Sequence, residues 1–171
     1  MKINKIILHH TATDTGTFAS IKRHHIKERG FNDIAYHYLI TTDGKVYKGR
    51  EEHIVGAHTL GQNDQSLGIC LVGNFDHYKP NEAQIKALVT LIKELWNKHG
   101  KLPVHGHNEF AAKSCPGKMF PWSELKALLE DHWAEKFYQS LLSKGMIIHD
   151  RRFNDKITRG EVFALLDQLK E

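Results

Sequence analysis

The sequence has little cysteine and no long apolar run. Only Cys70 and Cys115 occur among 171 residues. This excludes the several disulfides that stabilise small secreted proteins, and it leaves a single bridge as an open alternative. The apolar run within residues 1–8 is far shorter than a signal-peptide core. No segment approaches the roughly 20 apolar residues that span a bilayer. We therefore expect a chain made in the cytoplasm, with no export signal and no membrane insertion.

Blocks of like charge, internal repeats and low-complexity segments are also missing. The 24 Lys and Arg residues exceed the 20 Asp and Glu residues, which gives a formal net charge of +4. The basic residues are spread along the chain, so we expect no nucleic-acid partner, whereas the net charge suits work on an anionic surface. The length allows one packed domain and a smaller appendage.

Strand and helix patterns alternate along the first 130 residues, which predicts an α/β fold. Both faces of residues 66–72 are apolar apart from Gly68, as in a central strand. Asp43-Gly44 predicts a hairpin because glycine tolerates positive φ. The helix with the clearest apolar period begins at an Asn81-x-x-Gln84 capping pattern and ends at Gly100. The expected strands are residues 5–9, 36–41, 45–48, 66–72 and a short one from 104, and the expected helices are 17–29, 82–99 and 122–130.

An irregular loop over residues 107–117 carries the most informative chemistry. His107, Lys113 and Cys115 lie close together there, between glycine and proline residues that exclude regular structure. Imidazole and thiolate are ligands that zinc prefers, and three protein ligands leave its fourth position for water. The third ligand could be His9 or His10, at the end of the first strand. A lone Cys is more often a buried apolar residue, so the spacing alone leaves the metal site open.

Several motifs resemble, in order along residues 1–130, the type 2 N-acetylmuramoyl-L-alanine amidases, a superfamily that includes phage endolysins and animal peptidoglycan-recognition proteins. The resemblance implies a central mixed β-sheet flanked by helices. It also implies an enzyme that cuts the amide bond between the sugar strand and the peptide stem of bacterial peptidoglycan. The motifs are Ile7-Leu8-His9-His10-Thr11-Ala12, Ala35-Tyr36-His37-Tyr38-Leu39-Ile40, Asp43-Gly44, Val55-Gly56-Ala57-His58, Asn63, Ser66-Leu67-Gly68-Ile69, Leu71-Val72-Gly73, His107 and Lys113-Ser114-Cys115-Pro116.

Carried over by position, the resemblance implies one zinc ion per chain, bound by His9, His107 and Cys115. Neighbouring strand residues point to opposite faces, so His9 and His10 cannot both face the metal, and the family pattern selects His9. Tyr36 and Lys113 are then the catalytic side chains. The remaining positions are His58 and Asn63 as contacts for the peptide stem, and His37 as a group that supports the site from behind.

Each implied role has a plainer alternative. Tyr36 could be a core aromatic, Lys113 a solvated charge, and His58 and Asn63 ordinary loop residues. Many relatives carry a glutamate general base in the central strand, whereas this chain has Cys70 there, which we expect to be a buried structural residue. The proton acceptor therefore stays open.

The character of the sequence changes near residue 132. We expect a catalytic domain over residues 1–131 and a small helical segment over 132–171. Part of that segment, from Lys144 to Glu161, resembles a single S-layer homology motif, which implies binding to secondary cell-wall polysaccharide. Packing on the main domain, or pairing with a second copy, is the alternative.

The expected function is that of a phage or prophage endolysin released to the wall through a holin-type pore. Two alternatives remain at this stage. One is a module that binds peptidoglycan fragments without cutting them, which Cys115 disfavours because non-catalytic relatives typically lack that ligand. The other is a cytoplasmic amidase that recycles soluble fragments, which a wall-binding segment disfavours.

Overall fold

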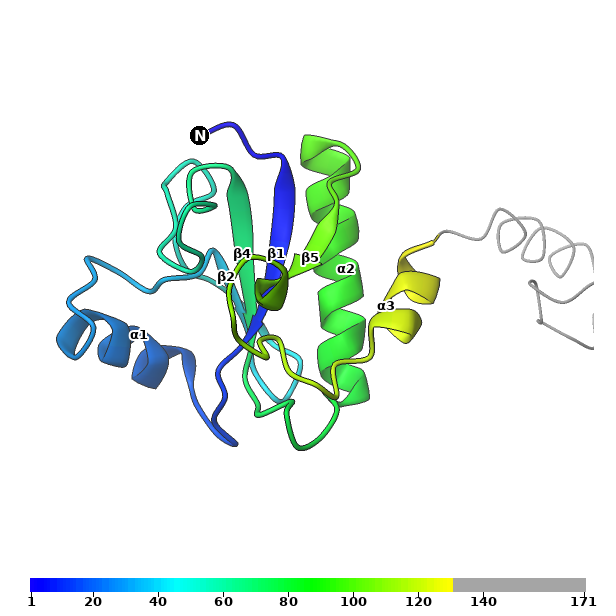
Figure 1. The fold of residues 1–171 in the computed structure, drawn as a ribbon, viewed down its shortest axis with the longest axis horizontal. Helices are drawn as coiled ribbons and strands as arrows, with labels where there is room; N and C mark the ends of the chain where they lie inside the picture. Colours follow the sequence, from blue (N-terminus) through cyan, green and yellow to red (C-terminus); the bar gives the residue numbers. More distant parts are fainter. Residues whose placement is uncertain (131–171) are drawn as a thin grey trace, which may run out of the picture. The chain divides into compact units, whose positions relative to one another are not determined.

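A five-stranded mixed sheet forms the centre of the fold (Figure 1). The computed structural model describes residues 1–130, so the predicted boundary near residue 131 and the helical C-terminal segment lie outside the described residues. The strand order is β3-β2-β4-β1-β5, and every neighbouring pair is parallel except the antiparallel pair β2 and β3. This confirms the predicted α/β fold with a central mixed sheet. The strands are β1 (Lys5–His10), β2 (Tyr38–Ile40), β3 (Val46–Lys48), β4 (Ser66–Leu71) and β5 (Val104–Gly106).

Helices cover both faces of this sheet. On one face lie α2 (Glu82–His99) and α3 (Trp122–Leu129), whose apolar side chains share a core with Ile6, Leu8 and Ile69. On the other face, α1 (Phe18–Lys27) packs Phe18 and Ile21 near the buried thiol of Cys70. Alternate residues of each strand therefore serve two different layers. No helix within residues 1–130 is long and apolar enough to cross a membrane.

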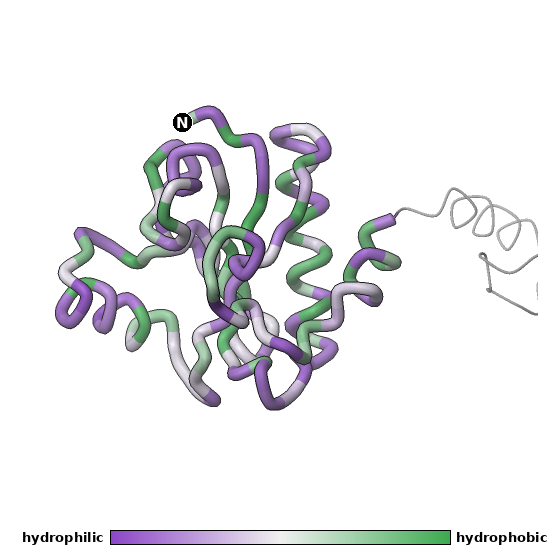
Figure 2. The backbone as a smooth tube through the Cα atoms, viewed as in Figure 1, coloured by the Kyte–Doolittle hydropathy of each residue, from purple (hydrophilic) through white to green (hydrophobic). Residues whose placement is uncertain are grey.

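The longest helix, α2, has the limits that its sequence predicts. The Asn81 side chain accepts from the backbone N–H of Gln84 at 2.9 Å, and the Gln84 side chain accepts from the backbone N–H of Asn81, which completes the capping box. Gly100 ends the helix with a φ of 83°. Hydrophobic and hydrophilic residues alternate along its length (Figure 2), as expected of a helix with one face buried.

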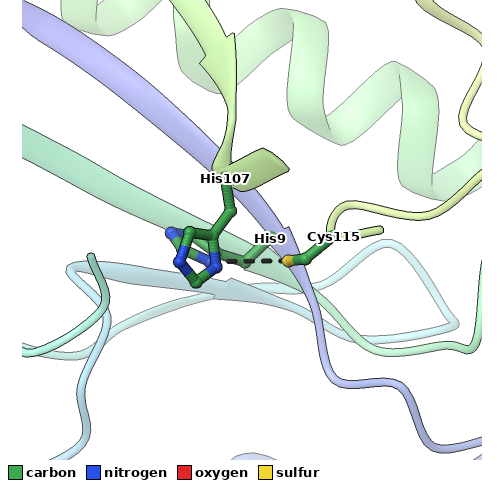
Figure 3. A group of neighbouring side chains, drawn as sticks. All are labelled: His9, His107 and Cys115. Carbon is green, nitrogen blue, oxygen red and sulfur yellow. Dashed lines mark hydrogen bonds between the residues drawn. The ribbon is translucent and has the colours of Figure 1, made fainter. Parts of the chain in front are cut away.

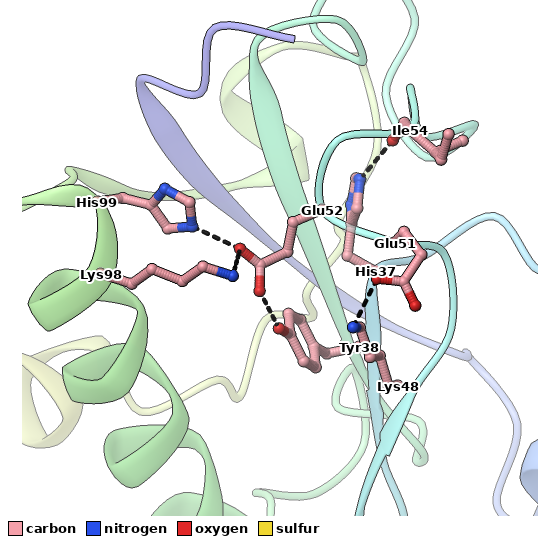
Figure 4. A network of polar contacts seen from close by, with 8 residues as sticks. All are labelled: His37, Tyr38, Lys48, Glu51, Glu52, Ile54, Lys98 and His99. Carbon is pink, nitrogen blue, oxygen red and sulfur yellow. Dashed lines mark hydrogen bonds and ion pairs between the residues drawn. The ribbon is translucent and has the colours of Figure 1, made fainter.

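The C-terminal end of α2 is tied to the sheet by the carboxylate of Glu52 (Figure 4). This group accepts from the Tyr38 hydroxyl at 2.6 Å, from Lys98 at 2.9 Å and from His99 at 2.5 Å. Burial alone would raise the pKa of Glu52, but these hydrogen bonds lower it to about 2. This network joins α2 to β2 and lies away from the histidine-rich end of β1.

Candidate metal centre

His9, His107 and Cys115 meet at one end of the sheet (Figure 3). Their ligand atoms all lie within 4.8 Å of one another. His9 is in β1, His107 begins the short 3-10 helix η1 (His107–Glu109) after β5, and Cys115 lies in the loop that follows. The His9 Nδ1 atom is 3.6 Å from the Cys115 Sγ atom. The ring centroids of His9 and His107 are 4.7 Å apart. The structure thus brings together the three side chains that the resemblance implied as ligands.

The register of β1 explains why His9 rather than His10 joins this group. His9 pairs with Cys70, and Ile7 with Gly68, on the face opposite α2. His10 points the other way, and its Nδ1 atom accepts from the backbone N–H of Phe75 at 3.1 Å. His10 still contributes its backbone N–H, which lies 3.4 Å from the Cys115 Sγ atom.

The loop that carries Cys115 is held against the segment after β4 by Asp76. Its carboxylate accepts from the Ser114 hydroxyl at 2.7 Å and from the backbone N–H of Lys118 at 3.0 Å. Gly117 has a φ of 115°, and a Cβ there would lie 2.4 Å from the carbonyl carbon of Phe75. Only glycine fits so close an approach, so the position of the thiol is fixed on both sides.

The protonation of the three side chains follows from burial. Burial, helped by the nearby His58 and His107 rings, holds the pKa of His9 well below its usual value. Burial and the charge of Lys113 lower the pKa of His107. Burial raises the pKa of Cys115 to about 11, although the His10 N–H and the Lys113 charge act in the opposite direction. The site therefore offers two neutral imidazoles and one thiol, which only a nearby cation would ionise. This is the donor set of a three-ligand zinc site, so these residues fit zinc.

A cleft of about 820 Å³ opens above this group. It runs past the segment after β1 and along α1. Tyr36 lines it with its ring centroid 5.2 Å from that of His9. Burial, together with the Cys70 and Cys115 thiols, raises the pKa of Tyr36 well above its usual value, so the phenol stays a hydrogen-bond donor. Lys113 is exposed at the rim of the same cleft.

Comparison with known proteins decides the family. A family model described as N-acetylmuramoyl-L-alanine amidase matches residues 1–118. The chain belongs to this amidase family. The endolysin of Escherichia phage T7 is 36% identical over 120 residues, which are 65% of this chain and 78% of that protein. The endolysin of Klebsiella phage KP32 is 34% identical over 140 residues, 75% of this chain and 91% of that protein.

A solved structure has the same fold. The N-acetylmuramoyl-L-alanine amidase LysC from Clostridium intestinale superposes with a TM-score of 0.72 at 36% identity, over 75% of this chain and 86% of that chain. The prediction of an N-acetylmuramoyl-L-alanine amidase is therefore confirmed for the family and for the class of enzyme.

The amidase uses Asn63 to organise a loop. The Asn63 Oδ1 atom accepts from the backbone N–H groups of His58 and Thr59, both at 2.8 Å, and Asn63 does not line the cleft. The His58 ring packs behind His9, with its Nδ1 atom 3.0 Å from the His9 Nε2 atom. Burial, with a smaller effect of His37, lowers the pKa of His58 to about 3, so this ring is neutral.

His37 joins two segments of backbone. Its Nδ1 atom accepts from the Gly68 N–H at 2.9 Å, and its Nε2 atom donates to the Ile54 carbonyl at 3.0 Å (Figure 4). Its ring centroid lies 5.7 Å from that of His58. His9 and His58 both line the cleft, and His37 lies beside His58 on the side away from His9.

His25, in α1, was not predicted as a site residue, although it borders the cleft. The side chain is half-buried, and its Nδ1 atom accepts from the Ala35 N–H at 3.1 Å. Its ring meets Tyr36 edge-on at 5.4 Å. Burial lowers its pKa to about 4, so it is neutral at ordinary pH. The available signal was its position four residues after Ile21, on the same face of α1.

Proposed function

We propose that the chain is a zinc-dependent amidase that hydrolyses the lactyl amide bond between N-acetylmuramic acid and L-alanine in bacterial peptidoglycan. The observation that carries this proposal is the group of His9, His107 and Cys115 at the floor of the cleft. Membership of the N-acetylmuramoyl-L-alanine amidase family supports the choice of bond. His9 and His107 would each supply one nitrogen, and Cys115 its sulfur.

Zinc held in this way lowers the pKa of water toward neutrality and polarises a carbonyl, which lets an amide be attacked at ordinary pH. The protein holds the proposed ligands in fixed positions. Asp76 holds the Cys115 loop, and the His10 backbone N–H supports the sulfur. These contacts place the donor atoms before any substrate binds, so little reorganisation is needed.

Tyr36 and Lys113 are proposed to stabilise the oxygen that gains negative charge as the amide carbon becomes tetrahedral. The Tyr36 phenol keeps its proton and is therefore a donor. Lys113 is two residues before Cys115 and lines the same cleft, so its positive charge can reach the same oxygen. A donor and a cation aimed at the same oxygen stabilise the transition state more than the ground state.

Cys70 is proposed to have a structural role. Its thiol is fully buried below Tyr36, and burial raises its pKa well above the usual value. A thiol that stays protonated is a poor proton acceptor, so Cys70 does not replace the glutamate of other amidases. Both cysteines are free.

The biological setting that we propose is cell lysis by a phage or prophage endolysin, which reaches the wall through a holin-type pore. The support for this is that the T7 and KP32 relatives are endolysins. Cleavage of intact wall distinguishes this role from the recycling of soluble fragments, and any cleavage distinguishes it from a module that only binds.

The test is digestion of purified sacculi with and without a chelator. We expect new amino groups of L-alanine to appear, without new reducing sugar ends, and we expect the release to stop after chelation and resume when zinc is added. New reducing ends would indicate a glycosidase. Binding to sacculi without release of any product would establish the non-catalytic alternative.

We further propose a division into a catalytic domain over residues 1–131 and a segment over 132–171 that binds secondary cell-wall polysaccharide. Removal of residues 132–171 should then weaken binding to whole sacculi more than it slows cleavage of a small soluble muropeptide. Sedimentation with sacculi and turnover on the soluble substrate measure the two effects. Equal losses in both would instead indicate a packing role for this segment.

A further inference from the structure

We propose that His58 is a positioning residue for His9 and not a contact for the peptide stem. It accepts the hydrogen on the His9 Nε2 atom, and this directs the lone pair of the His9 Nδ1 atom toward His107 and Cys115. The inference rests on the zinc site proposed above.

The two nitrogens of His9 face different partners. Nδ1 lies 3.6 Å from the Cys115 Sγ atom, whereas Nε2 lies 3.0 Å from the His58 Nδ1 atom. A neutral imidazole carries a hydrogen on one nitrogen only. Nδ1 can serve as a ligand atom only when that hydrogen is on Nε2, where it needs an acceptor. Within residues 1–130, the neutral ring of His58 and the hydroxyl of Thr59 are the acceptors in reach, and the Thr59 oxygen is the more distant at 3.4 Å.

The fold makes a close-fitting space for the His58 ring. A Cβ atom on Gly56 or on Gly68 would lie 2.5 Å from the ring carbons of His58. Gly68 is in the middle of β4, where glycine weakens a strand, so its place there is explained by the approach of this ring. Two glycines from different segments therefore hold the imidazole in one orientation behind His9.

His58 lines the cleft, but neither of its nitrogens is available to a ligand there. Nδ1 is engaged by His9 and by the Thr59 hydroxyl at 3.1 Å. Nε2 is buried and has no close hydrogen-bond partner within residues 1–130. Burial lowers the pKa of the ring, and a hydrogen bond with the backbone of Ser66 acts in the opposite direction. The nitrogen with a close side-chain partner is Nδ1, and it faces His9.

Two variants distinguish the effect of losing the hydrogen-bond acceptor from the effect of losing the volume of the ring. His58→Leu removes both nitrogens and fills much of the space, whereas His58→Asn retains an acceptor at about the position of Nδ1. We expect zinc affinity, measured by competition with a chelator, to fall by about 10–100-fold in His58→Leu and to stay within about threefold of wild type in His58→Asn. The affinity for an uncleaved peptide stem should stay unchanged in both.

Normal zinc affinity in His58→Leu, with weaker peptide binding, would overturn the proposal and restore His58 as a substrate contact. A wild-type protein that binds no zinc would instead refute the proposed function itself. If His58→Leu fails to fold, long-range ¹H–¹⁵N NMR correlations of the zinc-loaded wild type give the answer. The hydrogen is expected on Nε2 of His9, with the His58 Nδ1 atom unprotonated, and the reverse pattern would contradict the proposal.

Discussion

A Cys115→Ser variant is expected to bind zinc much more weakly than wild type. The loss should exceed the roughly 10–100-fold that follows removal of a residue that only hydrogen-bonds to a metal ligand. Serine has almost the same shape, but its hydroxyl does not ionise near neutral pH and is a poor ligand for zinc, whereas a thiolate is a strong one. Turnover should fall with metal content. Zinc content after dialysis against a weak chelator, measured beside turnover on a muropeptide, gives both quantities.

Cys70 supplies the matched control for this prediction. Its thiol is also buried, and it pairs with His9 across the strands β1 and β4, but it is not part of the group of ligand atoms. Cys70→Ser should therefore retain zinc, even if its stability falls. A Cys115→Ser protein that holds zinc as firmly as wild type would contradict the proposed ligand set.

The second large effect is expected for Tyr36→Phe, which should lower turnover by on the order of 10²–10³-fold, or about 3–4 kcal/mol of barrier. The change removes one donor hydroxyl and keeps the ring that packs beside His9 and His25. Zinc content and substrate affinity should stay close to wild type, because the hydroxyl acts on charge that develops only in the transition state.

Tyr47→Phe is the control, since Tyr47 stacks on Phe18 and does not line the cleft. Its turnover should match that of wild type. Steady-state kinetics on a defined muropeptide, with thermal unfolding of both variants, makes the comparison. If Tyr36→Phe turned over within about threefold of wild type, well under one kcal/mol of barrier, Tyr36 would have no place in the chemistry.

The elements that the sequence predicts well are those with local causes. Asn81 and Gln84 are three residues apart and cap the N-terminus of α2, and Gly100 ends the helix, so both of its limits match the prediction. Gly44, with a φ of 77°, makes the turn between β2 and β3 in the same way. Such contacts lie within one or two turns of chain, where residue type alone decides the geometry.

The site depends on contacts between distant segments, and sequence patterns do not contain these. His9 and Cys115 are 106 residues apart. The residues alone leave His9 and His10 as alternatives, and only the family resemblance selects His9. The face that each histidine occupies follows from the register of β1 with β4. The loop role of Asn63 and the place of His58 behind His9 likewise require the packed structure.

The most direct test of the zinc site is anomalous diffraction from crystals of the zinc-loaded protein, with data on both sides of the zinc absorption edge. We expect one strong difference peak per chain, within bonding distance of His9 Nδ1, a His107 ring nitrogen and Cys115 Sγ, at about 2.0–2.3 Å. A protein that is active on muropeptides but has no peak at this position, or has its peak at other residues, would contradict the account.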